Sequence, residues 1–151
     1  RQRQMCIRDR LWSDRNEILP YKNLTEAITL ASIIEKEGLE KNKIAGVFIN
    51  RLRIGMKLQS DPTVIYALGK DFDGDIKRKD LRIDNPYNTY RYKGLPPGPI
   101  SIVSEESLEA ALNPEETDFL YFVSMKNGFH KFSKNLTEHN EAVLKYQINE
   151  R

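Results

Sequence analysis

Two carboxylates stand at the point where an apolar segment ends. Residues 30–37 read LASIIEKE, so Glu35 and Glu37 follow a run of leucine, alanine and isoleucine, and Gly38 comes next. A carboxylic acid that keeps its proton near neutral pH can protonate a leaving group, which makes an acid beside apolar side chains a candidate general acid. The simpler interpretation is that both glutamates solvate a helix end, because charged side chains are mostly exposed.

Residues 26–37 are predicted to form the helix that positions both glutamates. Thr25 is a suitable N-cap, and Gly38 would supply the left-handed residue that ends the helix. Side chains two residues apart on a helix diverge by about 200°, so Glu35 and Glu37 cannot both point into one cleft. Each lies near an edge of the broad apolar arc, and periodicity therefore does not choose between them.

The position along the helix axis favours Glu37. This residue immediately precedes Gly38, at the negative end of the helix dipole, where an ionised carboxylate is disfavoured. Partial burial beside Ile33 and Ile34 would raise its pKa in the same direction. Glu37 is therefore the preferred general acid, and Glu35 is the second candidate.

Composition favours one compact domain and excludes several other classes. The chain has 151 residues, of which 39% are hydrophobic and 30% charged, and its net charge of +2 is far from that of a nucleic-acid binder. One cysteine excludes an internal disulfide framework, and two histidines argue against a Cys/His zinc site. We expect no metal, no cofactor, no nucleic acid and, without an apolar run of spanning length, no membrane contact by this chain.

The first ten residues, RQRQMCIRDR, show no usable periodicity. The string resembles translated sequencing-adapter text, so residues 1–10 are expected to be a non-native tail and no element is predicted there. Residues 11–151 are then expected to form a single domain whose natural N-terminus is missing.

A second helix is predicted over residues 41–53, from the spacing of its apolar residues, with Gly55 as its stop signal. Together with the first helix it would form a helical hairpin. Asp61 before Pro62 is a helix start signal, since an N-cap acceptor is followed by a proline at the first helical position. The resulting short helix should end after Leu68.

Loops dominate the next part of the chain. Residues 70–86 are predicted to be loops with a short helix near Lys79, and residues 85–101 are too rich in proline and glycine for a regular helix. Ser104 should open a helix that closes at Asn113.

The last part of the sequence predicts a hairpin and a helix. Asn127 and Gly128 separate two β-prone runs, which is the pattern of a tight hairpin, and a final helix should run from about Thr137 toward Tyr146. The fold class expected is α+β, mostly helical with a small antiparallel β-hairpin sheet.

Four blocks of sequence are distinctive: LASIIEKEG, IAGVFINRLRIGMKLQSDPTVIYALG, NPYNTYRYKGLPPGPIS, and FLYFVSMKNGFHKF with TEHN. In order and without large gaps, from about Leu11 to near Tyr146, they resemble the catalytic domain of the MltG/YceG-like endolytic murein transglycosylases. The resemblance implies a lysozyme-like catalytic domain over residues 11–151. It also implies an enzyme that cleaves peptidoglycan between N-acetylmuramic acid and N-acetylglucosamine, leaves a 1,6-anhydro end and terminates strand elongation.

The family's essential glutamate lies in the EKE segment. In similar lysozyme-like lytic enzymes a small hydroxyl residue follows the acid, which by resemblance assigns the role to Glu37, although Gly38 stands here in place of that hydroxyl residue. Glu35 therefore stays the second choice. A lytic enzyme needs one acid, which protonates the leaving oxygen and then accepts the proton of the muramyl 6-hydroxyl, whereas hydrolysing glycosidases use two carboxylates.

Asp61 is the candidate second carboxylate, but capping the helix next to Pro62 explains this residue without catalysis and is the favoured interpretation. Gln59 and Ser60 resemble a family motif and are candidates for hydrogen bonds to sugar hydroxyls or N-acetyl groups. Asp61 is grouped with them as a candidate substrate contact.

The loop residues Tyr87, Asn88, Thr89 and Tyr90 are further candidate substrate contacts. Tyrosine faces suit pyranose rings, and an asparagine amide can serve both sides of an acetamido group, while simple packing is the alternative. Pro97 belongs to a stiff segment expected to form a wall beside the cleft.

Two further pairs of residues have competing interpretations. Asn50 and Arg51 either orient Glu37 or form a salt bridge at a helix end. His130 and His139 are expected to hydrogen-bond structurally and to take no part in the chemistry.

The resemblance also implies a location and partners. It places the intact protein in the inner membrane, with this domain outside the cytoplasm and the anchor missing here, and links it to the peptidoglycan synthesis machinery. The alternatives are a non-catalytic peptidoglycan-binding module and a muramidase that uses water.

Overall fold

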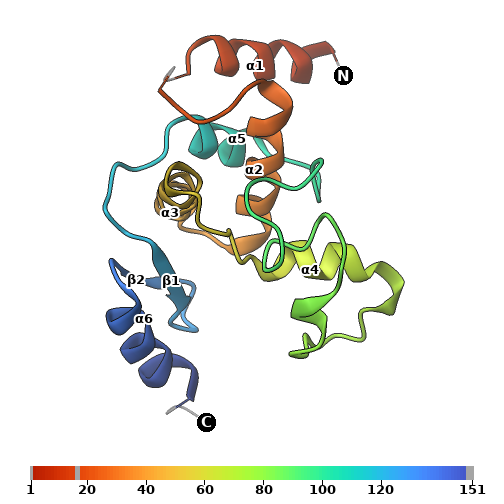
Figure 1. The fold of residues 1–151 in the computed structure, drawn as a ribbon. Coiled ribbons are helices and arrows are strands. Elements are labelled where there is room, and N and C mark those ends of the chain that lie inside the picture. The colour runs from red at the N-terminus through yellow and green to blue at the C-terminus, as the bar shows by residue number, and fades with distance from the viewer. Residues whose placement is uncertain (1, 16–17, 149–151) are drawn as a thin grey trace.

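The computed structural model describes residues 2–15 and 18–148, which form the α+β fold expected (Figure 1). The α-helices are α1 (Gln2–Ser13), α2 (Leu24–Glu37), α3 (Lys41–Ile54), α4 (Asp61–Leu68), α5 (Glu105–Leu112) and α6 (Leu136–Val143). The strands are β1 (Tyr121–Ser124) and β2 (His130–Ser133), and the shorter helical segments are η1 (Gly69–Asp71), η2 (Asp80–Arg82) and η3 (Leu144–Ile148).

Helix α2 begins two residues earlier than predicted because Asn23, and not Thr25, caps it. The Asn23 side chain accepts a hydrogen bond from the Glu26 N–H at 3.0 Å, and the Glu26 carboxylate accepts one from the Lys22 N–H at 2.6 Å. This reciprocal arrangement satisfies two backbone donors at the helix start. The predicted end at Glu37 is confirmed.

Gly38 ends α2, but its predicted left-handed helical conformation is wrong, because its φ and ψ are 157° and −163°. A Cβ at this position would lie 2.9 Å from Cε1 of His130. The absence of a side chain at Gly38 therefore lets the His130 ring approach the backbone directly after Glu37.

Helix α3 follows after a short turn and ends as predicted. Gly55 adopts the left-handed conformation, with φ of 73°, and its N–H and that of Met56 donate to carbonyls of the last turn. This arrangement satisfies orphan carbonyls at the helix end. Helices α2 and α3 pack against each other as the predicted helical hairpin.

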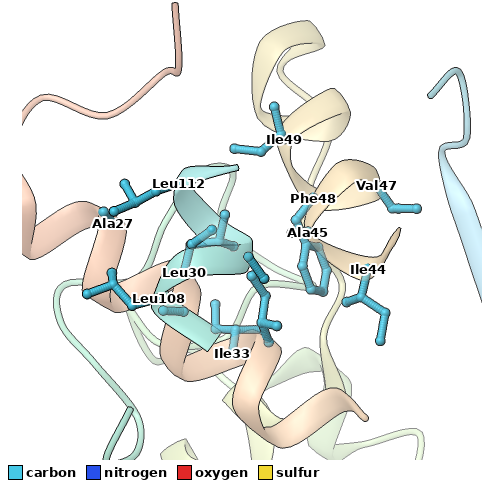
Figure 2. Close-up of a cluster of buried hydrophobic side chains, with 14 of the residues drawn as sticks. Ala27, Leu30, Ile33, Ile44, Ala45, Val47, Phe48, Ile49, Leu108 and Leu112 are labelled. Atoms are coloured by element: carbon cyan, nitrogen blue, oxygen red, sulfur yellow. The ribbon is translucent and has the colours of Figure 1, made fainter. Parts of the chain in front are cut away.

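The hydrophobic core lies between α2, α3 and α5, whose apolar side chains point toward one another (Figure 2). Leu30 and Ile33 of α2, Phe48 of α3 and Leu108 of α5 are almost completely buried. Each such side chain contributes roughly 1.5–3 kcal/mol through the hydrophobic effect. The apolar face of α2 is therefore fixed in the core, which determines where the glutamates at its end can point.

The hairpin forms where predicted, although its connection is longer than a tight turn. Strands β1 and β2 are antiparallel, with Tyr121 opposite Ser133 and Ser124 opposite His130. Residues 125–129 connect the strands, so Asn127 and Gly128 lie in the connection as predicted, but the connection is longer than these two residues alone. Helix α6 packs on this hairpin.

The predicted helix starts are confirmed to within one residue for α5, which Ser104 caps, and for α6, which Asn135 caps. The expected short helix near Lys79 is η2, and residues 85–101 form no α-helix, as predicted.

No element is predicted for the first ten residues, but residues 2–10 contribute to a helix, since α1 covers residues 2–13 and packs against α5. Their non-native origin stays a prediction. Across residues 2–15 and 18–148, none of the helices combines the length and the apolar character that crossing a bilayer requires.

Candidate active site

The end of α2 lies between the hairpin and α4 (Figure 1), and Glu37 there lines a groove of about 600 Å³. We call this the Glu37 groove. Its walls come from α2, α3, the 58–61 segment, Tyr90, the hairpin and α6. Its polar and aromatic lining residues are Glu37, Arg51, Gln59, Asp61, Tyr90, Tyr121, Phe122, Ser124, His130, His139 and Gln147.

Glu37 is partly buried, and its carboxyl is held by one hydroxyl. Oγ of Ser60 donates to Oε1 of Glu37 at 2.5 Å. Burial raises the pKa of Glu37 to about 7, the Ser60 hydrogen bond opposes this rise, the charge of Asp61 adds to it, and the charge of Arg51 opposes it. The predicted rise is thus confirmed in direction, and at pH 7 this carboxyl is available both as proton donor and as proton acceptor.

The hydroxyl group missing at Gly38 is supplied from another element. Ser60 lies directly before α4 and is only 1% exposed, so its side chain serves Glu37 and is not free to contact a ligand. The sequence placed Ser60 near the site but predicted sugar binding, because nothing in its local sequence shows that it faces the end of α2.

Glu35, the second candidate acid, points away from the Glu37 groove. It accepts hydrogen bonds from Oγ of Ser104, at 2.7 Å, and of Ser107, and lies 3.6 Å from Nζ of Lys41. The Ser107 hydrogen bond is the largest cause of a lowered pKa for Glu35. The predicted divergence of the two glutamates is confirmed, and Glu35 connects α2 to the start of α5 as an ionised group.

The turn that carries Ser60 is held by Thr89. The N–H of Ser60 donates to Oγ1 of Thr89 at 2.9 Å, and the N–H of Gln59 donates to the Thr89 carbonyl at 3.3 Å. Thr63 adds a hydroxyl contact to Thr89 at 2.8 Å. Gln59 has φ of 51°, an unfavourable value for a residue with a side chain. The hydrogen bonds around the turn hold the backbone in this conformation. Thr89 is 1% exposed and so fixes the turn from inside.

Asp61 does not cap α4, so that interpretation is wrong. The N-cap is Ser60, without a side-chain cap hydrogen bond, whereas Oδ1 of Asp61 accepts a hydrogen bond from the Tyr90 hydroxyl at 2.5 Å. Burial, followed by the contact with Asp61, raises the pKa of Tyr90. Asp61 and Tyr90 both line the Glu37 groove, which therefore contains two carboxyl groups.

Asn88 lies in the interior and not on a groove wall. It is fully buried, and its amide donates to the carbonyls of Leu81, at 3.1 Å, and Ile83, at 2.9 Å. Its Oδ1 accepts from the Tyr90 N–H at 3.0 Å. The amide thereby shapes the loop that presents Tyr90, and the acetamido contact expected of Asn88 finds no support in this placement.

Tyr87 and Pro97 are also separate from the Glu37 groove. The Tyr87 ring packs against Tyr66, with ring centroids 4.8 Å apart, and against the core. Pro97 lines another hollow, near Thr25 and Thr29 in the first half of α2. Of the predicted substrate contacts, the structure brings Gln59, Asp61 and Tyr90 to the groove beside Glu37.

Arg51 is buried behind the groove and Asn50 faces elsewhere. Arg51 donates from Nε to the Leu120 carbonyl at 2.7 Å and from a terminal nitrogen to the Leu58 carbonyl at 2.5 Å. Its charge reaches Glu37 without a direct ion pair between the two residues in the described chain. Asn50 donates to backbone carbonyls of residues 117 and 119, so it does not orient Glu37.

The sequence missed the wall formed by the hairpin and α6. Tyr121 stacks on His139 with ring centroids 4.9 Å apart, and His130 lies against Glu40, whose carboxylate accepts the His130 N–H at 2.5 Å. Burial lowers the pKa of His139, and its Nδ1 has no hydrogen-bond partner. The TEHN block marked the region, but only the folded arrangement of the hairpin and α6 shows that these rings line the same groove as Glu37.

The other hollows and side-chain clusters of the described residues are weaker candidates for an active site. A hollow of about 570 Å³ on the side of α3 near residues 113–118 contains neither glutamate of the EKE segment. Within residues 2–15 and 18–148, no group of three or more histidine, cysteine, aspartate or glutamate side chains is arranged to hold a metal ion.

Comparison with known proteins agrees with the resemblance in the sequence blocks. The model of the YceG-like family matches residues 2–145. The chain is 54% identical over 122 residues to the endolytic murein transglycosylase of Bacillus subtilis (strain 168), covering 79% of this chain and 34% of that protein. It is 38% identical over 148 residues to the protein of the same name from Streptococcus pneumoniae (strain R6), covering 88% and 27%.

The crystal structure of a yceG-like protein from Listeria monocytogenes is similar, with a TM-score of 0.74 and 51% identity over 80% of this chain and 40% of the other. The chain spans about a third or less of the length of the curated relatives above. By its match over residues 2–145 and by these identities, the chain belongs to the YceG-like family.

Proposed function

We propose that this chain is the catalytic part of an endolytic murein transglycosylase, which cleaves the bond between N-acetylmuramic acid and N-acetylglucosamine in peptidoglycan strands. The names of the curated relatives support the substrate class. The observation that carries the proposal is the Glu37 carboxyl, whose pKa is raised to about 7 in a groove where Ser60 orients it.

In the proposed reaction Glu37 acts first as acid and then as base. It protonates the glycosidic oxygen as the bond from that oxygen to the muramyl anomeric carbon breaks. The muramyl 6-hydroxyl then bonds to the anomeric carbon, and its proton returns to the Glu37 carboxylate. The products are a 1,6-anhydro-muramyl end and an N-acetylglucosamine end with a free hydroxyl, and no water is consumed. A pKa near the working pH suits a group that performs both transfers.

The groove offers groups that suit a glycan strand. Its volume lies in the range of ligand sites, and Gln59, Tyr90 and Tyr121 present an amide and aromatic faces along it. We propose these three as substrate contacts. Thr89 and Asn88 are proposed as supports that place the contacting residues.

Asp61 favours a second candidate function, a muramidase that uses water. Hydrolysing glycosidases flank the bond with two carboxyl groups, and Asp61 lines the same groove as Glu37. In that case Asp61 would activate the water and the product would have a reducing end.

One experiment separates these functions. Isolated murein is incubated with the chain, and the released ends are identified by mass spectrometry. Anhydro ends support the transglycosylase, and reducing ends indicate the muramidase. Binding without release indicates a non-catalytic peptidoglycan-binding module.

We propose that the domain works on the extracytoplasmic side of the inner membrane, because the glycan strands of murein lie there, as part of a longer anchored protein. The curated relatives are about three to four times as long as the matched region, which leaves room for an anchor and for contacts with the peptidoglycan synthesis machinery. Fractionation of cells expressing the longer protein, with protease protection of this domain, tests the location.

A further inference from the structure

Two hydrogen-bonded pairs lie at the Glu37 groove, Ser60 with Glu37 and Tyr90 with Asp61. They are connected through the chain because Ser60 and Asp61 are consecutive residues. Ser60 donates to Glu37, and Tyr90 donates to Asp61. We propose that Asp61 and Tyr90 are a positioning pair for Glu37, in which the Tyr90 hydroxyl holds the Asp61 carboxylate at the groove and the negative charge of Asp61 keeps the proton on Glu37. The inference rests on the proposed function of Glu37 as the acid.

The position of the Asp61 charge is fixed by backbone contacts on both sides. Tyr90 is held through its N–H by the buried Asn88 side chain at 3.0 Å. The turn before Asp61 is held by Thr89, through the Ser60 N–H at 2.9 Å. Asp61 is itself exposed, but because residues 88–90 hold both the turn and the tyrosine, the Tyr90 hydrogen bond limits where its carboxylate can lie.

The charges around Glu37 oppose one another. Arg51 from α3 favours ionised Glu37, and Asp61 from the first turn of α4 favours protonated Glu37. The other titratable groups lining the groove are Tyr90 of the loop, Tyr121 of β1, His130 of β2 and His139 of α6. The Arg51 guanidinium already donates to the carbonyls of Leu58 and Leu120, and without Asp61 its charge would act on Glu37 unopposed.

Tyr90 is suited to hold Asp61 because its phenol stays protonated. Burial and the neighbouring carboxylate both raise the pKa of Tyr90, so its hydroxyl remains a donor throughout the range in which Glu37 titrates. A phenylalanine at this position would keep the ring and lose the donor.

The same loop contains a matched pair outside the groove. The Tyr92 hydroxyl donates to Oδ1 of Asp84, and Nε of Arg91 lies 3.4 Å from the same oxygen. Neither Tyr92 nor Asp84 lines the Glu37 groove. Asp84→Asn and Tyr92→Phe therefore repeat the two substitutions without touching the charges near Glu37.

The test is an NMR titration of the Glu37 side-chain carboxyl in the whole chain with ¹³C-labelled glutamate, assigned by its disappearance in Glu37→Gln. We expect Asp61→Asn to move the midpoint of Glu37 to lower pH by about one unit, since a nearby negative charge is lost. Tyr90→Phe should move it in the same direction by less. In the Asp61→Asn background, Tyr90→Phe should add nothing, because Tyr90 acts through Asp61. Asp84→Asn and Tyr92→Phe should leave the midpoint unchanged.

An unchanged midpoint in Asp61→Asn would overturn the inference, as would an equal shift in Asp84→Asn or a further shift from Tyr90→Phe in the double variant. Asp61→Glu keeps the charge, so its Glu37 midpoint should lie between that of Asp61→Asn and that of the unchanged chain. The titration needs no turnover, so it separates this inference from the proposed function, which fails if Glu37→Gln still releases murein fragments. With substrate, the alkaline limb of kcat/KM should move together with the titration midpoint of Glu37. If Asp61 instead activated water, Asp61→Asn would abolish hydrolysis at every pH.

Discussion

Oγ of Ser60 lies 2.5 Å from Oε1 of Glu37, although 23 positions separate these residues in the chain. The contact joins the C-terminal end of α2 to the turn before α4. It supplies a hydroxyl at the acid where the residue that follows the acid, Gly38, has no side chain. The position of the acid thus depends on how the 59–61 turn is fixed to Thr89.

Glu37→Gln should abolish the release of murein fragments and leave the fold intact. A glutamine keeps the volume and can still accept the Ser60 hydrogen bond, but it cannot donate a proton to the leaving oxygen. General acid–base groups contribute about 10²–10⁴-fold to rates, so we expect a loss in kcat of at least that size. The rate of murein digestion measures it.

Glu35→Gln is the control for this substitution, because Glu35 points away from the groove toward Ser104 and Ser107. It should keep most of the activity and lose some thermal stability. Full activity in Glu37→Gln with an inactive Glu35→Gln would show that the acid has been assigned to the wrong glutamate.

Conformational stability should fall as pH rises through neutrality because of Glu37. Its pKa in the folded protein is raised to about 7, above the unfolded value near 4.5, so its protonated form contributes stability that is complete below pH 4.5. That contribution is lost as the pH rises through 7, and it amounts to roughly 3–3.5 kcal/mol at most. Urea unfolding between pH 4.5 and 8 measures the free energy of unfolding at each pH. Glu37→Gln is the reference, because it lacks the titration of Glu37. Equal slopes in both proteins would contradict the raised pKa.

Ser60→Ala should change both the rate and its pH dependence. The Ser60 hydrogen bond opposes the rise in the pKa of Glu37, so its removal should move the alkaline limb of kcat/KM to higher pH. The maximum rate should still fall, because the carboxyl loses the group that orients it. Ser60→Thr keeps a hydroxyl and is the matched control; a limb that moves to lower pH in Ser60→Ala would refute the assigned role.

Helix boundaries and the core were predictable because local signals and packing agree in this part of the chain. The apolar face of α2 and the glycines after α2 and α3 placed the helical hairpin correctly, and α2 carried Glu37 to its end. The same periodicity correctly separated Glu35 from Glu37. These features depend on residues close together in the sequence.

The roles of the loop residues were not predictable, because they depend on contacts between distant segments. Asn88 and Thr89 have the side chains of sugar-binding residues, but both are buried in hydrogen bonds to backbone or to α4. Asp61 has the local sequence of a helix cap, yet its side chain accepts a hydrogen bond from Tyr90, 29 positions later in the chain. A single sequence cannot distinguish a polar residue that binds a ligand from one that holds a loop.

Asn88→Ala should therefore act mainly by lowering the free energy of unfolding. It should affect substrate binding only indirectly, by disturbing the loop that presents Tyr90. The substitution removes three side-chain hydrogen bonds, to the carbonyls of Leu81 and Ile83 and from the Tyr90 N–H. The Ile83 carbonyl keeps the hydrogen bond from the Asn85 N–H, whereas the Leu81 carbonyl and the Tyr90 N–H lose the Asn88 partner, at a cost of about 1–3 kcal/mol for a buried group left unpaired. Thermal unfolding measures the loss. Asn127→Ala removes an exposed asparagine contact in the hairpin loop and should change the melting temperature far less.

Gly38→Ala should disturb the groove by pushing His130 away from the end of α2. The new Cβ would lie 2.9 Å from Cε1 of His130, closer than such atoms approach, so the ring or the hairpin has to shift. His130 is held by Glu40 on its other side, which limits how far it can move. We therefore expect lower stability and lower kcat. Replacing His130 by alanine in the Gly38→Ala background should restore part of the stability, because the clash is removed; if the two losses simply add, the close approach of His130 is not what requires glycine at this position.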